Sequence, residues 1–522
     1  MEKCKMPQNY TTIKEMFLGS IDKYANEVGF LEKRPGYKEF RNITYKEFGE
    51  DVIALGTALV EKLGLEGERI AVIGENSYEW AVSYFSVACG AGIVVPIDKE
   101  LPSNEIENLV RRSEAKAIFY SPRKRDTIEE VKKAKTNLKY FIELYPTEDK
   151  SPINIDEENH TIDELIECGK GMDSKRYLDI KIDPEEFRIL LFTSGTTQEA
   201  KGVMLTNRNI MSNLHAAIKL VHLYDGDRFF SVLPLHHSYE SSIGMMIPIY
   251  NGLSIAYAGG LKSIANDLKE TKPTIMLVVP ALIENLVKKI NREIDKKGKT
   301  KLVDCVIKAT NMLGSLGWKM KKELLKDVHA ALGGRVRLIV SAAAPMDPAI
   351  GKRIEDFGIF FIQGYGLTET SPLAALVPFD NRKVASVGIA APCCEIKINE
   401  PNEEGIGEVF IKGENVTQGY YKNDSETAKA ITDGWFHSGD LGYFDKDGFL
   451  YLTGRSKNLI ITGNGKNVYP EEIETLINKI GYVNESMVYA KPDPKDKNEQ
   501  IIAVKVTLDD AYLKEKFGDN IP

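Results

Sequence analysis

The sequence predicts an α/β protein: a large N-terminal domain of two doubly wound α/β lobes with a small β-barrel or distorted sheet, then a small α+β C-terminal domain. Up to about Pro372, short apolar runs alternate with helical patterns, which is typical of parallel sheets covered by helices. Short runs and turns follow, and mixed α/β patterns return after Arg455. A chain of 522 residues is also too long for one core. We therefore expect a domain at 1–456, divided at 1–183, 184–371 and 372–456, and a second domain at 457–522.

In the first lobe, Thr44 and Glu47 form a capping box, because their side chains can satisfy the first free backbone N–H groups of a helix. Apolar runs predict strands at residues 69–73, 93–97 and 117–120. The segment 145–183 is rich in Asp, Glu and Lys, and we expect it to be connecting surface.

In the second lobe, a helix is expected from Thr206, and a helical pattern covers 281–290. Apolar runs predict strands at 229–233, 253–257, 275–279 and 336–340.

The later segments carry turn and cap signals. Residues 443–452 predict a hairpin, because Asp447-Gly448 suits the positive φ angles of a tight turn. Pro470 is expected in the first turn of a helix.

Composition excludes several classes of protein. A net charge of −8 gives no broad basic surface for nucleic acid, and clusters such as 319–322 are expected to be solvated helix faces. Six cysteines without a C-x-x-C pair argue for a reducing compartment and against a zinc site. No signal peptide or apolar run of about twenty residues is visible. We expect a cytoplasmic protein with at most peripheral membrane contact, and the oligomeric state stays open.

The stretch from Thr193 to Val203, T-S-G-T-T-Q-E-A-K-G-V, has the composition of a polyphosphate-binding loop. Glycine exposes backbone N–H groups, hydroxyls add donors, and Lys201 supplies a positive charge. The loop follows the apolar run 189–192, and ligands of α/β proteins bind at the ends of buried strands. A flexible surface turn is the alternative, whereas the P-loop of ordinary NTPases is excluded by spacing.

A second group of residues, 363–370, follows the apolar run 359–362. Tyr365 can stack on a base, and Thr368 with Glu369 can contact a phosphate and Mg²⁺. A turn with a surface charge is the alternative. In a third group, Asp440 could accept hydrogen bonds from both ribose hydroxyls and Arg455 could reach the ribose or a phosphate. An ordinary turn aspartate is the alternative there.

Together these motifs are similar to those of the adenylate-forming superfamily, which includes acyl-CoA synthetases, luciferases and the adenylation domains of peptide synthetases. The family loop T-S-G-T-T-G-x-P-K-G is matched except at Gln198 and Ala200. The segments Gln363 to Thr370, Trp435 to Asp440 and Gly454 to Lys457 also match, in the family's order along nearly the whole chain. The segment His236-His237-Ser238-Tyr239-Glu240 resembles the corresponding segment of bacterial long-chain fatty acid ligases.

The resemblance implies roles for individual residues. Lys201, His237, Thr368 and Glu369 would be catalytic, with His237 near the reacting carboxylate and Glu369 holding Mg²⁺. Small residues at Ser341 to Pro345 would line the adenine pocket. The implied nucleotide-binding residues are Thr193, Ser194, Gly195, Thr196, Thr197, Lys201, Ala343, Gln363, Tyr365, Gly366, Thr368, Asp440 and Arg455.

The implied activity is an ATP-dependent acyl-CoA synthetase that uses a fatty acid, ATP and CoA, with Mg²⁺. The small C-terminal domain would be mobile, with a hinge at Lys457 and a thiol-side loop containing Gly463 and Gly465. The family's late lysine in a Gly-Lys context has no match among Lys505, Lys514 and Lys516, so this domain is expected to be incomplete. Transfer to a carrier protein, or nucleotide binding without turnover, are the alternatives.

Overall fold

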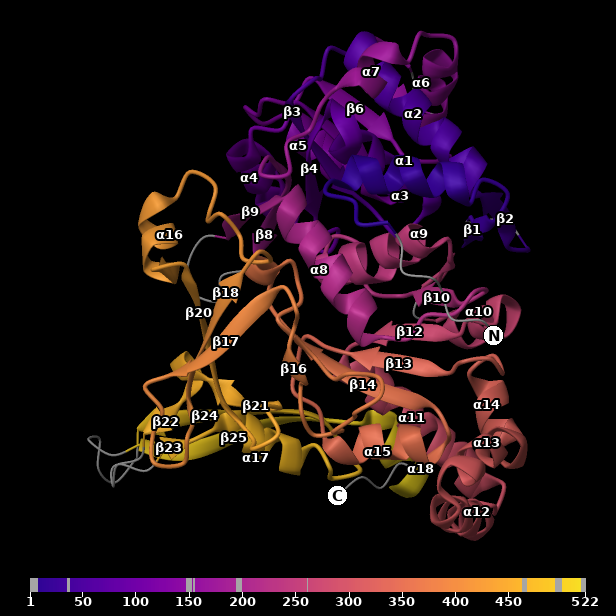
Figure 1. Ribbon diagram of the computed structural model, residues 1–522, viewed down its shortest axis with the longest axis vertical. Helices are drawn as coiled ribbons and strands as arrows, with labels where there is room; N and C mark the ends of the chain where they lie inside the picture. The colour runs from indigo at the N-terminus through magenta and orange to yellow at the C-terminus, as the bar shows by residue number, and fades with distance from the viewer. Residues whose placement is uncertain are drawn as a thin grey trace.

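The protein is described by a computed structural model that covers residues 8–34, 38–146, 153, 155–193, 200–260, 262–461, 467–492 and 500–517. It contains the two expected α/β lobes, which Figure 1 shows one above the other, with an antiparallel sheet beside the lower lobe. The strand-rich C-terminal segment lies below that antiparallel sheet. The predicted fold class is confirmed.

The upper lobe contains a seven-stranded sheet that is parallel except for its last strand, which runs antiparallel to its neighbour. Its order is β7 (Asn159–Thr161), β6 (Tyr140–Glu143), β5 (Ala117–Tyr120), β3 (Glu68–Ile73), β4 (Gly92–Ile97), β8 (Phe187–Thr193) and β9 (Lys201–Thr206). The central strands are buried because helices cover both faces, as the apolar runs predict.

Some helices of this lobe begin at a threonine whose side chain caps the first backbone N–H groups. Thr12 and Thr44 both form complete capping boxes with Glu15 and Glu47. The helices are α1 (Ile13–Lys23), α2 (Tyr45–Glu61), α3 (Tyr78–Ser86), α4 (Ser103–Ser113), α5 (Arg125–Lys132), α6 (Ile162–Lys170) and α7 (Lys175–Asp179).

Segment 145–183 is more than the connecting surface that its charges indicate. Helix α6 buries Ile162 and Leu165, and Tyr177 on α7 is 1% exposed. The hydroxyl of Tyr177 donates to the Ser86 carbonyl at 3.0 Å. Many polar residues of this segment lie on the outer face of an amphipathic helix. The overall polarity of the segment therefore wrongly predicts a connecting surface without packed helices.

The lower lobe contains a nine-stranded sheet whose central strands are parallel. Its order is β16 (Ile389–Ala390), β15 (Ala375–Leu376), β14 (Phe360–Tyr365), β13 (Leu338–Ser341), β12 (Ile275–Val278), β10 (Arg228–Ser231), β11 (Ser254–Tyr257), β1 (Val28–Glu32) and β2 (Arg41–Thr44). The predicted strands 229–233, 253–257, 275–279 and 336–340 correspond to β10, β11, β12 and β13.

The helices of this lobe follow the strands, as in other doubly wound folds. Thr206 caps the first of them, as expected. They are α8 (Asn207–Leu220), the π-helical turn η3 (Tyr239–Met246), α9 (Ile247–Asn251), α10 (Ile264–Thr271), α11 (Pro280–Lys296), α12 (Thr300–Met312), α13 (Gly314–Leu324), α14 (Lys326–Ala331) and α15 (Pro348–Asp356).

The strands do not divide between the lobes at residue 183, where the sequence places the boundary. Strands β1 and β2 join the lower sheet through the β1–β11 pair, and β8 and β9 join the upper sheet through the β4–β8 pair. Each lobe therefore contains two strands from the other lobe's expected range, because strand pairing brings together segments far apart in the chain.

Beside the lower lobe lies a five-stranded antiparallel sheet of β17 (Cys394–Asn399), β18 (Gly407–Gly413), β19 (Ile431–Thr432), β20 (Trp435–Phe444) and β21 (Leu450–Arg455). The predicted hairpin joins β20 to β21, and Gly448 in its turn has a φ of 80°. Within the described residues no pair joins β17 to β19 or β21, so this is an open sheet, the second of the two expected forms. Helix α16 (Asp424–Ala430) leads into β19.

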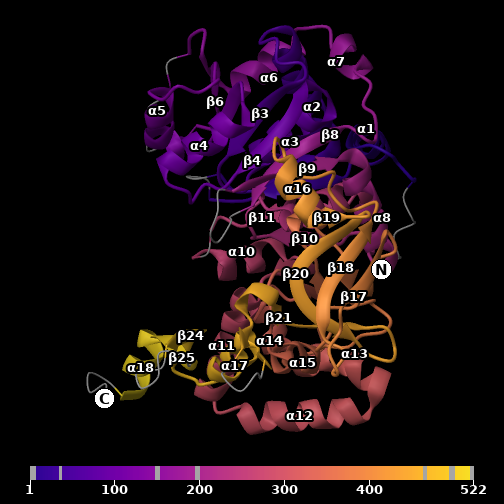
Figure 2. The same cartoon turned by 90° about the vertical axis from the view of Figure 1, so that its left-hand side faces the viewer.

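The C-terminal segment contains the short pair β22 (Ile460–Ile461) and β23 (Asn467–Val468), helix α17 (Pro470–Ile477), the hairpin β24 (Val483–Pro492) and β25 (Gln500–Leu508), and helix α18 (Asp510–Phe517). Figure 2 shows β24, β25 and α18 projecting from one side of the molecule. Arg292 on α11 forms an ion pair with Asp509 at 2.9 Å, which ties this segment to the lower lobe. In the described part of the chain, no helix is both long enough and apolar enough to cross a membrane.

Candidate active site

A cavity of about 1210 Å³ lies at the carboxyl ends of β10, β12, β13 and β14 and extends under α8. This volume exceeds the roughly 300–1,000 Å³ that is usual for a small-molecule site. The cavity is lined by residues from both lobes and from the antiparallel sheet. Ten of the residues expected at the site line it: Thr193, Lys201, His237, Ala343, Tyr365, Gly366, Thr368, Glu369, Arg455 and Lys457.

The predicted phosphate loop is described only at its two ends. Thr193 ends β8 and Lys201 begins β9, and the Thr193 hydroxyl donates to the Lys201 carbonyl at 3.4 Å. The loop therefore connects two paired strands at the cavity wall. Ser194, Gly195, Thr196 and Thr197 lie outside the described residues.

Lys201 is held by a residue from the antiparallel sheet region. Its Nζ lies 2.5 Å from Glu426 Oε2 on α16 and 4.9 Å from the centre of the Tyr420 ring. Hydrogen bonds from Lys201 and from Lys429 lower the pKa of Glu426 to about 2. The ammonium of Lys201 is therefore oriented by a charged partner at the edge of the cavity.

Glu369 is the acidic residue expected to hold a metal, and its carboxyl group lines the cavity at 8% exposure. The Tyr420 hydroxyl donates to its Oε1 at 2.9 Å. Burial raises the pKa of this carboxyl, and the hydrogen bond and Lys201 partly oppose that rise. No group of three or more His, Cys, Asp or Glu that could hold a metal occurs among the residues the structure covers. A cation here would depend on Glu369 together with ligand oxygens.

The end of β14 joins the second and third groups of motif residues. The Tyr365 hydroxyl donates to Asp440 Oδ2 at 2.8 Å, and Arg455 Nε lies 2.9 Å from Asp440 Oδ1. Burial raises the pKa of Asp440, whereas the positive charge of Arg455 lowers it. Asp440 itself is 6% exposed and does not line the cavity, whereas its partners Tyr365 and Arg455 do.

Gly366 and Ala343 adopt backbone arrangements that bring the main chain close to the cavity. A Cβ atom on Gly366 would come within 1.7 Å of the Pro372 carbonyl oxygen, so only glycine fits there. Ala343 has a φ of 78°, which is uncommon for a residue with a side chain. By contrast, Gln363 does not line the cavity, because its amide donates to the Val384 carbonyl at 2.5 Å.

His236 and His237 follow β10, and their rings lie 4.0 Å apart. Burial lowers the pKa of both, and that of His236 falls to about 4. Both imidazoles are therefore neutral at pH 7, and the 3.7 Å approach of His236 Nε2 to Asp98 is not an ion pair. A neutral imidazole has one donor and one acceptor, so His237 can donate a hydrogen bond into the cavity.

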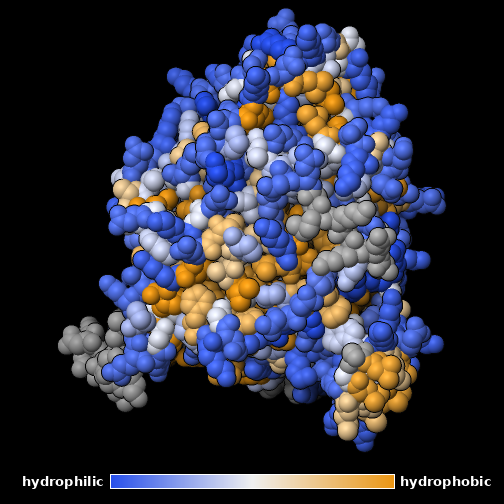
Figure 3. Space-filling view, viewed as in Figure 1, coloured by the Kyte–Doolittle hydropathy of each residue, from blue (hydrophilic) through white to orange (hydrophobic). Residues whose placement is uncertain are grey.

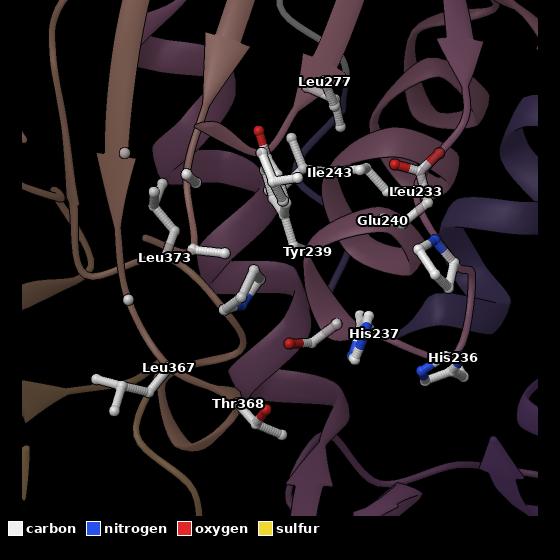
Figure 4. Close-up of a pocket in the computed structure, with 18 of the residues that line it drawn as sticks. Leu233, His236, His237, Tyr239, Glu240, Ile243, Leu277, Leu367, Thr368 and Leu373 are labelled. Carbon is white, nitrogen blue, oxygen red and sulfur yellow. The ribbon is translucent and has the colours of Figure 1, made fainter. Parts of the chain in front are cut away.

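The remainder of the cavity is apolar. Side chains from one face of the lower sheet and from α8 line it, among them Ala217, Ile218, Val221, Phe229, Ile275, Leu277, Leu338 and Val340. The Tyr239 hydroxyl donates to the Val340 carbonyl at 3.0 Å. Figure 4 shows the ring of Tyr239 between His237 and Thr368 on one side and Leu277 on the other. Tyr239 therefore stands where the polar part of the cavity meets the apolar part.

Glu240 adds a buried acid to the apolar part. It is 1% exposed, and neither of its carboxyl oxygens has a hydrogen-bond partner within normal geometry. Burial raises its pKa to about 8, against a smaller lowering by the Ser231 hydroxyl. The side chain is therefore mostly protonated at neutral pH. Its carboxyl lies over Gly244, where a Cβ atom would come within 2.7 Å of Cδ.

Sequence reasoning missed Tyr420 and Glu426, which hold Glu369 and Lys201. Tyr420 lies beside β9, because Tyr421 N–H donates to the Gly202 carbonyl at 2.7 Å. Its only local signal is an aromatic pair after Gly419 in a region of turns. The expected hinge residue Lys457 lines the cavity. Gly463 and Gly465 lie outside the described residues.

Comparison with known proteins identifies relatives over most of the chain. The profile of the AMP-binding enzyme family matches residues 23–421, well over half of the sequence. The long-chain-fatty-acid–CoA ligase FadD15 of Mycobacterium bovis is 27% identical over 492 residues, covering 90% of this chain and 77% of the relative. Human long-chain-fatty-acid–CoA ligase 1 is 28% identical over 491 residues, covering 89% and 70%.

Solved structures share the fold. ATP-bound MatB from Rhodopseudomonas palustris superposes with a TM-score of 0.73 at 24% identity, covering 95% of this chain and 89% of that one. The o-succinylbenzoate CoA synthetase MenE from Bacillus subtilis, in complex with its acyl-adenylate intermediate, gives 0.71 at 19% identity, covering 97% and 92%. At these identities the likeness extends to the fold alone.

Proposed function

The chain belongs to the AMP-binding enzyme family, and from this membership we propose an ATP-dependent, AMP-forming acyl-CoA synthetase that acts on long-chain fatty acids. The observation that carries the proposal is a cavity in which Lys201, Thr368 and Glu369 adjoin an apolar channel under α8. The names of the relatives, long-chain-fatty-acid–CoA ligases of a bacterium and of human, support the same substrate class.

On the polar side, ATP is the substrate whose parts suit the residues present. Tyr365 would stack on adenine, with the exposed backbone at Ala343 admitting the flat base. Asp440 would accept from the ribose hydroxyls while Tyr365 and Arg455 hold its carboxylate in place. Lys201 and Thr368, with the hydroxyls from Thr193 to Thr197, would contact the phosphates.

Mg²⁺ suits the donor set around Glu369. A carboxylate that is buried and fixed by one hydroxyl donor can give an oxygen to a hard cation, and phosphate oxygens can supply others. When bound, the ion would neutralise part of the phosphate charge. Burial raises the pKa of Glu369 even though Lys201 and Arg455 partly oppose that rise, so a bound cation would further favour the ionised carboxylate.

On the apolar side, the channel under α8 would hold the hydrocarbon chain of the fatty acid. Its lining is uncharged apart from Glu240, whose raised pKa keeps it mostly protonated near pH 7. His237 and Tyr239 lie at the start of this channel. A neutral His237 would donate a hydrogen bond to the substrate carboxylate and aim it towards the phosphates.

The reaction would take two steps. A carboxylate oxygen attacks the α-phosphorus of ATP, forming acyl-AMP as the bond to pyrophosphate breaks. The sulfur of CoA then attacks the acyl carbonyl, the bond to AMP breaks, and the thiol proton goes to solvent. The contribution of the protein is to position the reactants and to place Lys201 where phosphate charge changes.

We also propose that residues 1–456 form the AMP-binding domain and that 457–522 form a C-terminal domain that moves about Lys457. The support is that Lys457 lies two residues after the end of β21, in the short turn Ser456–Asn458, and lines the cavity. Rotation of the C-terminal domain about Lys457 would change which of its residues close the cavity in the first and in the second step. The loop containing Gly463 and Gly465 would then face the incoming thiol.

A panel of fatty acids from short to long, assayed for AMP release with ATP, Mg²⁺ and CoA, tests the function. We expect thioester formation with CoA and a preference for long chains. Product formed only with an acyl carrier protein would assign the alternative acceptor. Tight ATP binding with no AMP release from any acid would instead indicate a binding protein without turnover.

A further inference from the structure

Helices α12 and α13 form a hairpin whose outer face is apolar. Figures 1 and 2 both place α12 at the outer edge of the molecule, and Figure 3 shows a hydrophobic patch over this region. The patch, here named the hairpin face, consists of exposed side chains from both helices and their connection. They are Leu302, Met312, Leu313, Leu316, Met320 and Leu324, which are 40–88% exposed.

The exposed apolar residues are additional to the core-facing residues of these helices, because the inner side of each helix is already buried. On α12, Val303, Ile307 and Thr310 face the protein. On α13, Gly317 packs so closely that a Cβ atom would come within 1.8 Å of the Thr310 carbonyl oxygen. Leu316, Met320 and Leu324 are spaced by four residues and form a separate stripe. A surface helix with apolar residues on both sides has an outer face that needs a partner.

The charge around the hairpin face is strongly positive. Residues 295–327 contain nine lysines against Asp295, Asp304, Glu323 and Asp327, a formal charge of +5, whereas the whole chain carries −8. Lys301, Lys308, Lys319 and Lys322 are exposed among them, but Lys321 is buried and donates to the Glu355 carbonyl, contrary to the expected fully solvated cluster. The apolar patch is therefore flanked by exposed ammonium groups.

We propose that the hairpin face docks the protein onto the surface of an anionic lipid bilayer. Apolar side chains on helices lying in the interfacial plane enter the acyl boundary, while flanking lysines contact anionic headgroups. A second copy of the chain fits this face poorly, because a symmetric contact would bring two clusters of +5 together. Docking goes beyond the proposed reaction and does not depend on it, although a bilayer is where long-chain fatty acids partition.

Flotation with phospholipid vesicles tests the proposal without any assay of activity. The wild-type protein is expected to float with equimolar phosphatidylglycerol and phosphatidylcholine but not with phosphatidylcholine alone. The double variants L316S/M320S and K301E/K319E should each bind the anionic vesicles roughly tenfold more weakly, because they remove the apolar contacts and the basic contacts separately. The matched control L476S/M487S, at sites 63% and 54% exposed on α17 and β24, should float like the wild type.

Circular dichroism of each variant would show that the fold is retained. Wild-type protein that floats with neither vesicle, or hairpin variants that float as well as the control, would overturn the proposal. Sedimentation equilibrium without lipid provides a further outcome. Self-association lost in L316S/M320S, with no vesicle binding by the wild type, would assign the face to a second copy of the chain and overturn the lipid proposal.

Discussion

Lys201 Nζ and Glu426 Oε2 lie 2.5 Å apart, and they join the start of β9 to helix α16 across 225 residues of sequence. The lysine would meet phosphate charge during the proposed reaction, yet it is paired with a carboxylate beforehand. Because Glu426 also binds Lys429, it retains a cationic partner when Lys201 turns towards a ligand. The pair therefore orients the ammonium without fixing it permanently.

Lys201→Ala is expected to lower the rate of adenylation by roughly 10²–10³-fold, as the loss of a preorganised charge donor does in other enzymes. ATP–pyrophosphate exchange with a saturating fatty acid measures this step. Lys429→Ala is the matched control, because Lys429 bonds the same carboxylate but does not line the cavity. Its exchange rate should stay close to that of the wild type, and an unchanged rate in Lys201→Ala would remove Lys201 from the site.

Asp440→Asn should raise the KM for ATP by about 10- to 100-fold, because hydrogen bonds to a charged acceptor contribute about 1.5–3 kcal/mol. The variant keeps the shape of the side chain but loses the charge that Arg455 and the ribose hydroxyls would meet. Steady-state kinetics with ATP varied gives the value. Asp447→Asn in the β20–β21 turn, where the side chain bonds Lys383, should leave the KM unchanged. Equal effects of the two substitutions would contradict a role for Asp440 in nucleotide binding.

Glu369→Gln should raise the Mg²⁺ concentration needed for half-maximal exchange and lower the maximal rate by about 10²-fold, because an amide oxygen is a weaker ligand for a hard cation. A magnesium titration of the exchange reaction is the measurement. Tyr420→Phe removes only the hydroxyl that bonds Glu369 and should shift the Mg²⁺ midpoint far less. If both variants titrate like the wild type, Glu369 does not hold the metal.

The elements that short sequence patterns determine could be predicted well. Thr44 and Glu47 act within one helical turn, and the turn at Asp447-Gly448 depends on adjacent residues, so local sequence is sufficient. The convergence of motif residues also follows from local information. Parallel strands present their carboxyl ends at one edge, so loops after β10, β13 and β14 meet there whatever the exact strand order.

Features that depend on distant partners could not be predicted. Glu426 pairs with Lys201 and Tyr420 bonds Glu369 because residues 419–421 pair with β9, a contact that no local pattern contains. The same reason explains why β1 and β2 joined the lower sheet. Lys321 was expected in solvent with its neighbours, but helix packing turns it inward to the Glu355 carbonyl.

Tyr239→Ala should shift the preference of the enzyme towards longer or bulkier acyl chains. The ring stands between the polar part of the cavity and Leu277, so its removal opens the channel at its start. The ratio of kcat/KM for a long chain to that for a medium chain is expected to rise by about 10-fold, since even one extra methylene that fits an apolar pocket contributes about 1–3 kcal/mol. Tyr239→Phe, which loses only the hydrogen bond to Val340, should keep the wild-type ratio.

Glu240→Gln is expected to make the protein less sensitive to rising pH. In the folded state burial raises the pKa of Glu240 to about 8, whereas an unfolded glutamate has a pKa of about 4.3. Between these values the folded state keeps a proton that the unfolded state has lost. The free energy of unfolding therefore falls as pH rises, by up to about 1.4 kcal/mol per pH unit from this group.

The glutamine variant has no such proton, so its stability relative to the wild type should increase between about pH 4.3 and pH 8 and level off above that range. Urea unfolding at several pH values, followed by circular dichroism, measures the difference. Glu323→Gln, an exposed position on α13, serves as the control and should follow the wild-type profile. A constant difference between Glu240→Gln and wild type across the range would mean that Glu240 is ionised in the folded protein and bonded to a cation.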